Sequence, residues 1–285
     1  MPRLGLKIDV DTYCGMKNGV PRLLRTLDEF NLKGTFFLSI GPDNSGRAVL
    51  QLIKNPLFLK KMMKTKAASL YGWRTALYGT LLPAPMIALS FPDLVREILD
   101  KGHEVQFHAW DHRRWQDELT KKSDQWIEKW FESGIEGYRK LTGQNPTAFG
   151  APSWFIDERV LRIISRYHFE YLSCTRARMP FIHETIKVLE IPSDLPCFEE
   201  LDAQNGVSVL RKLSSDGQSH VLPVHAEVEG GIYEDKFKDL LKNVLTDGLD
   251  VVKLIDLHKD LINESVPVRK HKMALLAGRH SPCAV

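Results

Sequence analysis

Short apolar runs alternate with amphipathic stretches along the chain, a pattern that predicts strands alternating with helices. The expected strands cover residues 4–8, 35–40, 104–107, 147–149, 169–173, 187–191, 220–224 and 249–254. The expected helices cover residues 21–31, 123–141, 157–167 and 233–246. Because this alternation is typical of a mostly parallel sheet covered by helices, the sequence predicts an α/β fold, closed or nearly closed as a barrel.

The composition fits one globular domain. Of the 285 residues, 43% are hydrophobic, which is enough for a full core, and no internal repeat or linker divides the chain. The four cysteines are scattered and lack the spacing of a metal finger, which is typical of free thiols in a reducing compartment. No apolar stretch has the character of a signal peptide or the length of a membrane span. We therefore expect a single domain over residues 1–285 in a soluble or peripheral protein.

Charged and imidazole side chains gather where three of the predicted strands end. Asp9 and Asp11 come directly after the first strand. His108 and His112 follow the third strand, and His225 ends a later one. Because the ends of parallel strands meet at one edge, where barrel enzymes carry their active sites, we expect these five side chains to lie close together.

The residue types at this edge suit a hydrolytic metal site. His108 and His112, four residues apart, can reach one ion if they share a helical turn, and Asp11 adds a third ligand. A divalent ion there would lower the pKa of a water and polarise an acyl oxygen. Asp9 could then accept a proton and His225 donate one to the departing amine. Each piece alone has a simpler interpretation, since Asp-x-Asp often caps a turn and a single histidine is often a core residue.

The order of these residues resembles that of the NodB-homology polysaccharide deacetylases. In that family the first acid is the base, the second acid and the H-x-x-x-H pair bind the metal, and a late histidine is the acid. The resemblance gives these roles to Asp9, Asp11, His108, His112 and His225. It also implies a distorted (β/α)7-type barrel and a metal-dependent amidohydrolase. The metal stays open among zinc, manganese, cobalt and iron.

Longer motifs narrow the resemblance to one branch, whose members remove a formyl group from an aminoarabinose carried on undecaprenyl phosphate in lipid A modification. These motifs are GLKIDVDT at 5–12, GPDN at 41–44, AASLYGW at 67–73, FHAWDH at 107–112, HAEVEG at 225–230 and AGR at 277–279. The branch implies a lipid-linked amino-sugar substrate at the cytosolic face of the inner membrane. Trp154, Tyr71, Trp73 and Glu227 are candidates to contact the substrate, although packing is an equal alternative for Tyr71 and Trp73.

Two positions depart from the family pattern. Trp154 is followed by Phe155 where the family usually carries an arginine. Cys174 stands where it usually has an aspartate that orients the acid histidine. A neutral thiol cannot stabilise an imidazolium as a carboxylate does, so we expect another acid to orient His225. The candidates are Asp194, Glu227 and Glu229.

A basic amphipathic insertion is expected at about 44–92. It contains no acid and seven positive charges, from Arg47, Lys54, Lys60, Lys61, Lys64, Lys66 and Arg74, interleaved with apolar and aromatic residues. Such a composition suits an anionic membrane surface. The alternatives are a helical cover with a solvated basic face, or a nucleic-acid partner, for which no binding motif is present.

The sequence therefore predicts an N-deformylase that acts on lipid-linked formamido-arabinose. A deacetylase of the same fold that acts on another N-acyl sugar is the nearest alternative. A catalytically silent sugar-lipid binding protein is a second, favoured by Phe155 and Cys174.

Overall fold

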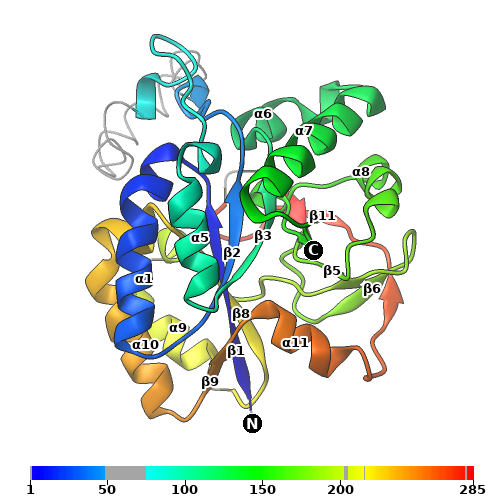
Figure 1. Ribbon diagram of the computed structural model, residues 1–285. Coiled ribbons are helices and arrows are strands. Elements are labelled where there is room, and N and C mark those ends of the chain that lie inside the picture. The colour runs from blue at the N-terminus through cyan, green and yellow to red at the C-terminus, as the bar shows by residue number, and fades with distance from the viewer. Residues whose placement is uncertain (1, 49–74, 202–204, 215, 280) are drawn as a thin grey trace.

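A curled, mostly parallel sheet forms the centre of the protein. The computed structural model describes residues 2–48, 75–201, 205–214, 216–279 and 281–285. Neighbouring strands of the main sheet run in the order β10-β6-β7-β5-β4-β3-β2-β1-β8, and β9 also pairs with β1 (Figure 1). The parallel pairs β5-β4-β3-β2-β1-β8 make up the greater part, so the predicted barrel-like α/β fold is confirmed in the form of a half-barrel.

The strands of this sheet match the predicted apolar runs. Their bounds are β1 Arg3–Val10, β2 Thr35–Ser39, β3 Glu104–Ala109, β4 Ala148–Phe149, β5 Tyr171–Leu172, β7 Leu189–Glu190, β8 His220–His225 and β9 Asp250–Val252. The pattern did not predict the short strands β6 Phe181–His183, β10 Val268–Arg269, β11 Met273–Ala274 and β12 Cys283–Ala284. These four strands are short, and unlike β4, β5 and β7 they do not lie within a longer apolar run.

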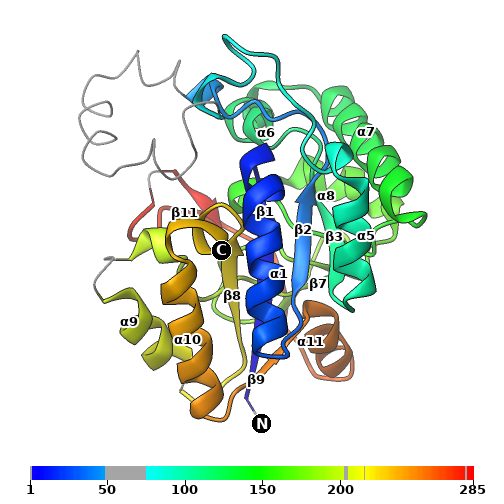
Figure 2. The same cartoon turned by 60° about the vertical axis from the view of Figure 1, so that its left-hand side comes forward.

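Helices lie along the outside of the sheet (Figures 1 and 2). The predicted ones are α1 Val20–Glu29, α7 Asp124–Thr142, α8 Glu158–Ile164 and α10 Glu234–Thr246. The other α-helices of the described residues are α5 Pro92–Asp100, α6 His112–Glu118, α9 Gly206–Ser214 and α11 Leu254–Leu261. In α7, the Ser123 side chain caps the first turn, and Gly143 ends the helix in the left-handed conformation with φ 75°.

Helix α11 closes the end of the half-barrel where the strands begin. The backbone N–H of Leu254 donates to Thr35 Oγ1 on β2 at 2.8 Å, and that of Ile255 donates to Glu104 Oε2 on β3 at 3.1 Å. Leu254 and Leu257 pack against an interior cluster that includes Phe37. The opposite end of the sheet, where the strands finish, is therefore left for the functional side chains.

The described ends of the predicted insertion are tied down at that edge. Asp43 N donates to the carbonyl oxygen of Pro85 at 2.8 Å, and Gly46 N to that of Tyr78 at 3.0 Å. Asn44 Nδ2 donates to Asp111 Oδ2 at 2.7 Å, directly beside the start of α6. Residues 49–74, with most of the predicted basic charges, Tyr71 and Trp73, lie outside the described residues. Within the described part, no helix has the length and apolar character needed to cross a membrane.

Candidate metal centre and active site

Two charged side chains, Lys7 and Asp9, lie on one face of β1, because successive side chains of a strand alternate between its faces. Asp9 therefore lies within the strand, not after it as expected, and Asp11 follows the end of the strand at Val10. Lys7 and Asp9 are buried among the apolar residues of the strand. β1 also pairs with β8 in a register that places Asp9 opposite His225. The predicted meeting of Asp9, Asp11 and His225 at one edge is thus present in the structure.

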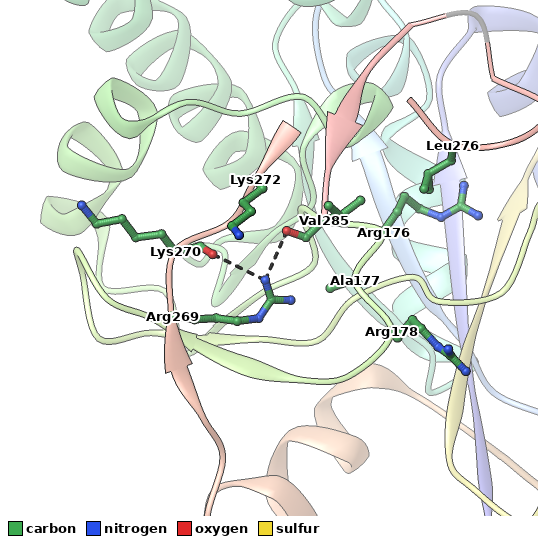
Figure 3. A pocket seen from close by; sticks show the side chains of 8 residues that line it. All are labelled: Arg176, Ala177, Arg178, Arg269, Lys270, Lys272, Leu276 and Val285. Carbon is green, nitrogen blue, oxygen red and sulfur yellow. Dashed lines mark hydrogen bonds between the residues drawn. The ribbon is translucent and has the colours of Figure 1, made fainter. Parts of the chain in front are cut away.

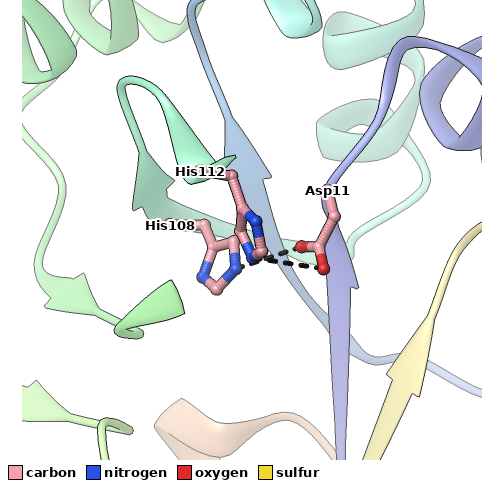
Figure 4. Close-up of side chains that lie close together, drawn as sticks. All are labelled: Asp11, His108 and His112. Atoms are coloured by element: carbon pink, nitrogen blue, oxygen red, sulfur yellow. Dashed lines mark ion pairs between the residues drawn. The ribbon is translucent and has the colours of Figure 1, made fainter. Parts of the chain in front are cut away.

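Asp11, His108 and His112 form a compact trio (Figure 4). Asp11 Oδ1 lies 3.1 Å from His108 Nε2, and Asp11 Oδ2 lies 3.2 Å from His112 Nε2. His108 lies within β3, so the expectation that both histidines follow the strand on one helical turn was wrong for His108. The strand runs on to Ala109, and His112 begins α6, capped by Asp111, so the chain bends back and brings the two rings to 5.1 Å between centroids.

These residues fit a divalent metal ion. One ligand atom from each of the three lies within 4.8 Å of the other two. Asp11 Oδ1 and His108 Nε2 are buried and have no hydrogen-bond partner, an arrangement that a shared cation would satisfy. The Nδ1 of His108 lies 2.7 Å from the carbonyl oxygen of Gly150, which fixes the ring with Nε2 toward the trio.

The protonation states of Asp11 and His112 are those that a metal requires. Burial would raise the pKa of the Asp11 carboxyl, but the imidazoles of His112 and His108 hold it well below its usual range. Burial lowers the pKa of His112 to about 4. Asp11 is therefore a carboxylate and His112 a neutral imidazole near neutral pH, as metal coordination demands.

Asp9 is paired with a buried lysine that the sequence prediction did not include. Lys7 Nζ lies 2.7 Å from Asp9 Oδ1 and also contacts Oδ2. The same ammonium lies 5.0 Å from the ring centre of Phe37 and 5.3 Å from that of Trp154. Lys7 is wholly buried, so its charge is compensated mainly by Asp9. The sequence does carry a sign of this partner, because Lys7 is a charged residue inside the otherwise apolar run of residues 4–8.

The imidazole of His225 is paired with Glu199, which was not among the predicted partners. Its Nδ1 lies 2.8 Å from Glu199 Oε1. Burial opposes the charged form, but the negative charge of Glu199 raises the pKa of His225 well above its usual value. Glu199 comes from a short turn, Phe198–Glu200, that follows an irregular segment, and nothing in its spacing from His225 indicates the contact.

The three predicted partners of the His225 ring have other roles. Asp194 lies 2.5 Å from the Nδ1 of His220 and accepts a hydrogen bond from Val221 N. Glu229 accepts from the backbone N–H of His225 at 2.7 Å rather than from its ring. Burial raises the pKa of Glu229 to about 8 and that of Glu227 well above its usual value. Glu229 is therefore mainly protonated at neutral pH, and burial favours the protonated form of Glu227 too, which makes both poor partners for an imidazolium.

Both departures from the family pattern point away from the site. The thiol of Cys174 donates to the carbonyl oxygen of Phe149 at 3.3 Å. The Phe155 side chain packs against the main hydrophobic core, and its carbonyl oxygen accepts a hydrogen bond from Trp115 Nε1. The charged partners of Asp9 and His225 are instead Lys7, on β1, and Glu199, in the turn after Cys197.

Trp154 forms a wall of the cavity above the metal trio. The cavity has a volume of about 340 Å³ and also borders Asp9, His225 and Glu227. Ser153 and Trp154 both adopt left-handed backbone conformations, with φ 54° and 53°, which are costly for side chains of this kind. The Trp154 indole is held by a hydrogen bond from Nε1 to Ser193 Oγ at 3.1 Å.

A second cavity of about 520 Å³ is lined by cationic side chains (Figure 3). They are Arg176, Arg178, Arg269, Lys270 and Lys272. Arg176 pairs with Glu200 at 2.9 Å, and Glu200 in turn pairs with Arg279 at 3.0 Å. Glu200 and Arg279 also border the cavity above the metal trio, so this chain of ion pairs lies between the two cavities.

The chain is similar in sequence to known proteins over most of its length. The sequence pattern of the polysaccharide deacetylase family matches residues 8–172. A protein of Shewanella sediminis, named probable 4-deoxy-4-formamido-L-arabinose-phosphoundecaprenol deformylase ArnD, is 33% identical over 91% of this chain and 87% of its own. A protein of the same name from Wigglesworthia glossinidia brevipalpis is 30% identical over 93% of this chain and 96% of its own.

Solved structures show the same fold. A protein from Mycobacterium smegmatis described as a polysaccharide deacetylase superposes with a TM-score of 0.67 at 18% identity, over 96% of this chain and 94% of its own. An acetyl xylan esterase from Clostridium thermocellum, in complex with a cobalt ion, superposes with a TM-score of 0.53 at 14% identity, over 90% of each chain. From the family pattern and the two relatives together, the chain belongs to the polysaccharide deacetylase family, in which it groups with the ArnD deformylases.

Proposed function

We propose that this protein is a metal-dependent hydrolase that removes the N-formyl group from 4-deoxy-4-formamido-L-arabinose linked to undecaprenyl phosphate. The observation that carries the proposal is that Asp9 and His225 border the same cavity as the Asp11-His108-His112 trio. The names of the two relatives support the choice of a formyl group and of a lipid-linked sugar.

Hydrolysis of the formamide needs a nucleophile and a protonated leaving group. Asp11, His108 and His112 would hold a divalent ion, which would supply Lewis acidity toward the formyl oxygen and a water molecule. Asp9 accepts a proton as the water oxygen bonds to the formyl carbon. His225 donates a proton to the sugar nitrogen as the carbon–nitrogen bond breaks, which leaves formate and a free amine.

Lys7 and Glu199 act as positioning residues in this scheme. The ammonium of Lys7 holds the Asp9 carboxylate by two contacts, in place of the arginine that Phe155 replaces. Glu199 holds the His225 ring and favours its protonated form, in place of the aspartate that Cys174 replaces. Base and acid thus each retain a partner of opposite charge, which disfavours the alternative of a catalytically silent binding protein.

The donor set leaves the metal open among zinc, manganese, cobalt and iron, because two imidazoles and one carboxylate suit all four. Trp154 and Glu227 contact the sugar, since both border the cavity. The adjoining cationic cavity and the basic insertion favour a phosphate-bearing substrate at an anionic membrane surface, on the cytosolic side where this lipid precursor is modified.

A comparison of substrates tests the proposal. The metal-loaded protein should release formate from the lipid-linked formamido sugar and show little activity on a soluble N-acetyl amino sugar. A preference for the N-acetyl sugar would favour the deacetylase alternative. No activity on either substrate, with metal bound, would favour a binding protein.

A further inference from the structure

A second set of metal-ligating side chains lies beside the catalytic cavity. Cys197 precedes the turn Phe198–Glu200, Glu199 lies within it, and His225 ends β8. The Cys197 sulfur, a Glu199 carboxylate oxygen and a ring nitrogen of His225 all lie within 4.8 Å of one another. A turn after an irregular segment and the end of a strand thus bring three different ligand types to one point.

The ring of His225 faces Glu199 within this cluster. Its Nδ1 is buried and lies 2.8 Å from Glu199 Oε1, and this ion pair lacks the geometry of a hydrogen bond. Cys197 is buried, whereas the Glu199 side chain is 36% exposed. The cluster is therefore dry on one side and open to solvent on the other, which gives an ion a path of entry.

The ligands of this second set favour a different range of metal ions from those of Asp11, His108 and His112. A thiolate, an imidazole and a carboxylate are the donors that zinc accepts, and three protein ligands leave one position for solvent. The thiolate disfavours magnesium, calcium and manganese, which prefer oxygen. Binding of a thiophilic ion releases the thiol proton of Cys197 to solvent, because a coordinating thiol is deprotonated.

We propose that Cys197, Glu199 and His225 form a second, inhibitory site for zinc or a similar thiophilic divalent ion. An imidazole that holds an ion through Nδ1 cannot also carry a proton there, so His225 can no longer form the imidazolium that protonates the leaving amine. Zinc in excess of one ion per chain therefore stops the reaction while the first site stays filled. The inhibition rests on the proposed function, but the second site itself does not.

Metal titration of the intact protein tests the site without an activity assay. In equilibrium dialysis the wild-type protein should bind two zinc ions per chain and Cys197→Ser one. In a cobalt titration, a thiolate-to-cobalt charge-transfer band should appear with the second equivalent in the wild type and be absent in Cys197→Ser. Cys283→Ser is the matched control, because Cys283 is a buried thiol of the same small cluster but not of the ligand set. It should keep both ions and the band.

An activity measurement then tests the inhibition. Excess zinc should inhibit the wild type and Cys283→Ser by about tenfold or more, while Cys197→Ser keeps its one-metal activity. If Cys197→Ser misfolds, Cys197→Ala takes its place in both measurements. Binding of a single zinc ion by the wild type, or an unchanged band in the Cys197 variants, would overturn the site. Inactivity of the one-metal enzyme would overturn the proposed function and leave the second site standing.

Discussion

The residues around Asp9 show how a buried charge can be compensated from within the same strand. Lys7 reaches Asp9 because residues two apart on a strand share a face, and the ion pair is almost wholly hidden from solvent. Breaking such a pair from one side leaves an uncompensated charge and typically costs about 3–5 kcal/mol. The pair is therefore a structural requirement of the strand as well as a support for the base.

Replacement of Lys7 separates these two roles. We expect Lys7→Met to lower kcat by about tenfold or more with little change in KM, because the Asp9 carboxylate loses the group that holds it. Lys7→Arg, which restores the charge, should recover most of the activity. Steady-state kinetics, with metal content and thermal unfolding measured on each variant, would check this. A Lys7→Met protein with wild-type kcat would show that Asp9 needs no cationic partner.

The pairing of His225 with Glu199 predicts a pH effect. Glu199 raises the pKa of His225, so its removal should lower that pKa. A general acid works only while protonated, so the basic limb of the kcat profile should move to lower pH in Glu199→Gln, and kcat should fall by about ten- to a hundredfold. Asp194→Asn is the control, because Asp194 pairs with His220 instead. An equal shift in both variants would refute a specific role for Glu199.

At the scale of elements, the site depends on how closely α1 and the segment after β8 approach each other. Gly19, just before α1, lies so near this segment that a Cβ atom there would come 1.9 Å from the carbonyl oxygen of Ala226. Ala226 follows His225, and its N–H donates to the carbonyl oxygen of Asp9 at 2.9 Å. Because Gly19 has no side chain, the start of α1 can approach the segment after β8 this closely, next to the adjacent strands that carry Asp9 and His225.

A glycine substitution tests this close approach. Gly19→Ala should destabilise the protein by about 1–3 kcal/mol, the usual cost of overpacking, and should lower kcat because the end of β8 must shift. Gly206→Ala in α9 is the control, since a Cβ there would make only ordinary contacts of 3.5 Å or more. Chemical denaturation of both variants gives the comparison. Equal stability of the two would contradict the packing argument.

The sequence predicted the strands and helices better than it predicted the ion-pair partners of the catalytic side chains. Apolar runs revealed the long strands and helices because their periodicity extends over many residues, and strand ends located Asp9, Asp11 and His225. The partner of His225 could not be predicted, because Glu199 reaches it through an irregular segment without a periodic pattern. His108 was assigned to the wrong element because a polar residue at a strand end looks like the start of a loop.

At the scale of the whole molecule, the described ends of the insertion lie at the edge where β1, β2 and β3 finish (Figure 1), and Asp11, His108 and His112 at this edge border the cavity above the metal trio. Asn44, at the start of the insertion, donates a hydrogen bond to Asp111, one residue before the metal-ligand candidate His112. A membrane-facing role for the segment would therefore place a lipid-linked substrate beside the active site. The charge of this segment, given by the sequence alone, makes that role testable.

Charge reversal tests membrane binding. We expect Lys60→Glu/Lys61→Glu/Lys64→Glu to weaken binding to anionic liposomes by about a hundredfold, since each basic residue near such a surface contributes about 1 kcal/mol. The control carries the same charge change on exposed lysines elsewhere: Lys129→Glu/Lys140→Glu/Lys212→Glu. Co-sedimentation would distinguish the two. Equal binding of both proteins would eliminate the insertion as a membrane contact.

Release of formate from undecaprenyl-phosphate formamido-arabinose, followed by mass spectrometry, tests the proposed chemistry most directly. The metal-loaded protein should release formate, and a chelator should abolish the reaction. Asp9→Asn should retain its metal, and its turnover should fall by about a hundredfold or more, the usual scale for the loss of a general base. Formate release that persists without metal, or at an unchanged rate in Asp9→Asn, would contradict the roles assigned to the trio and to Asp9.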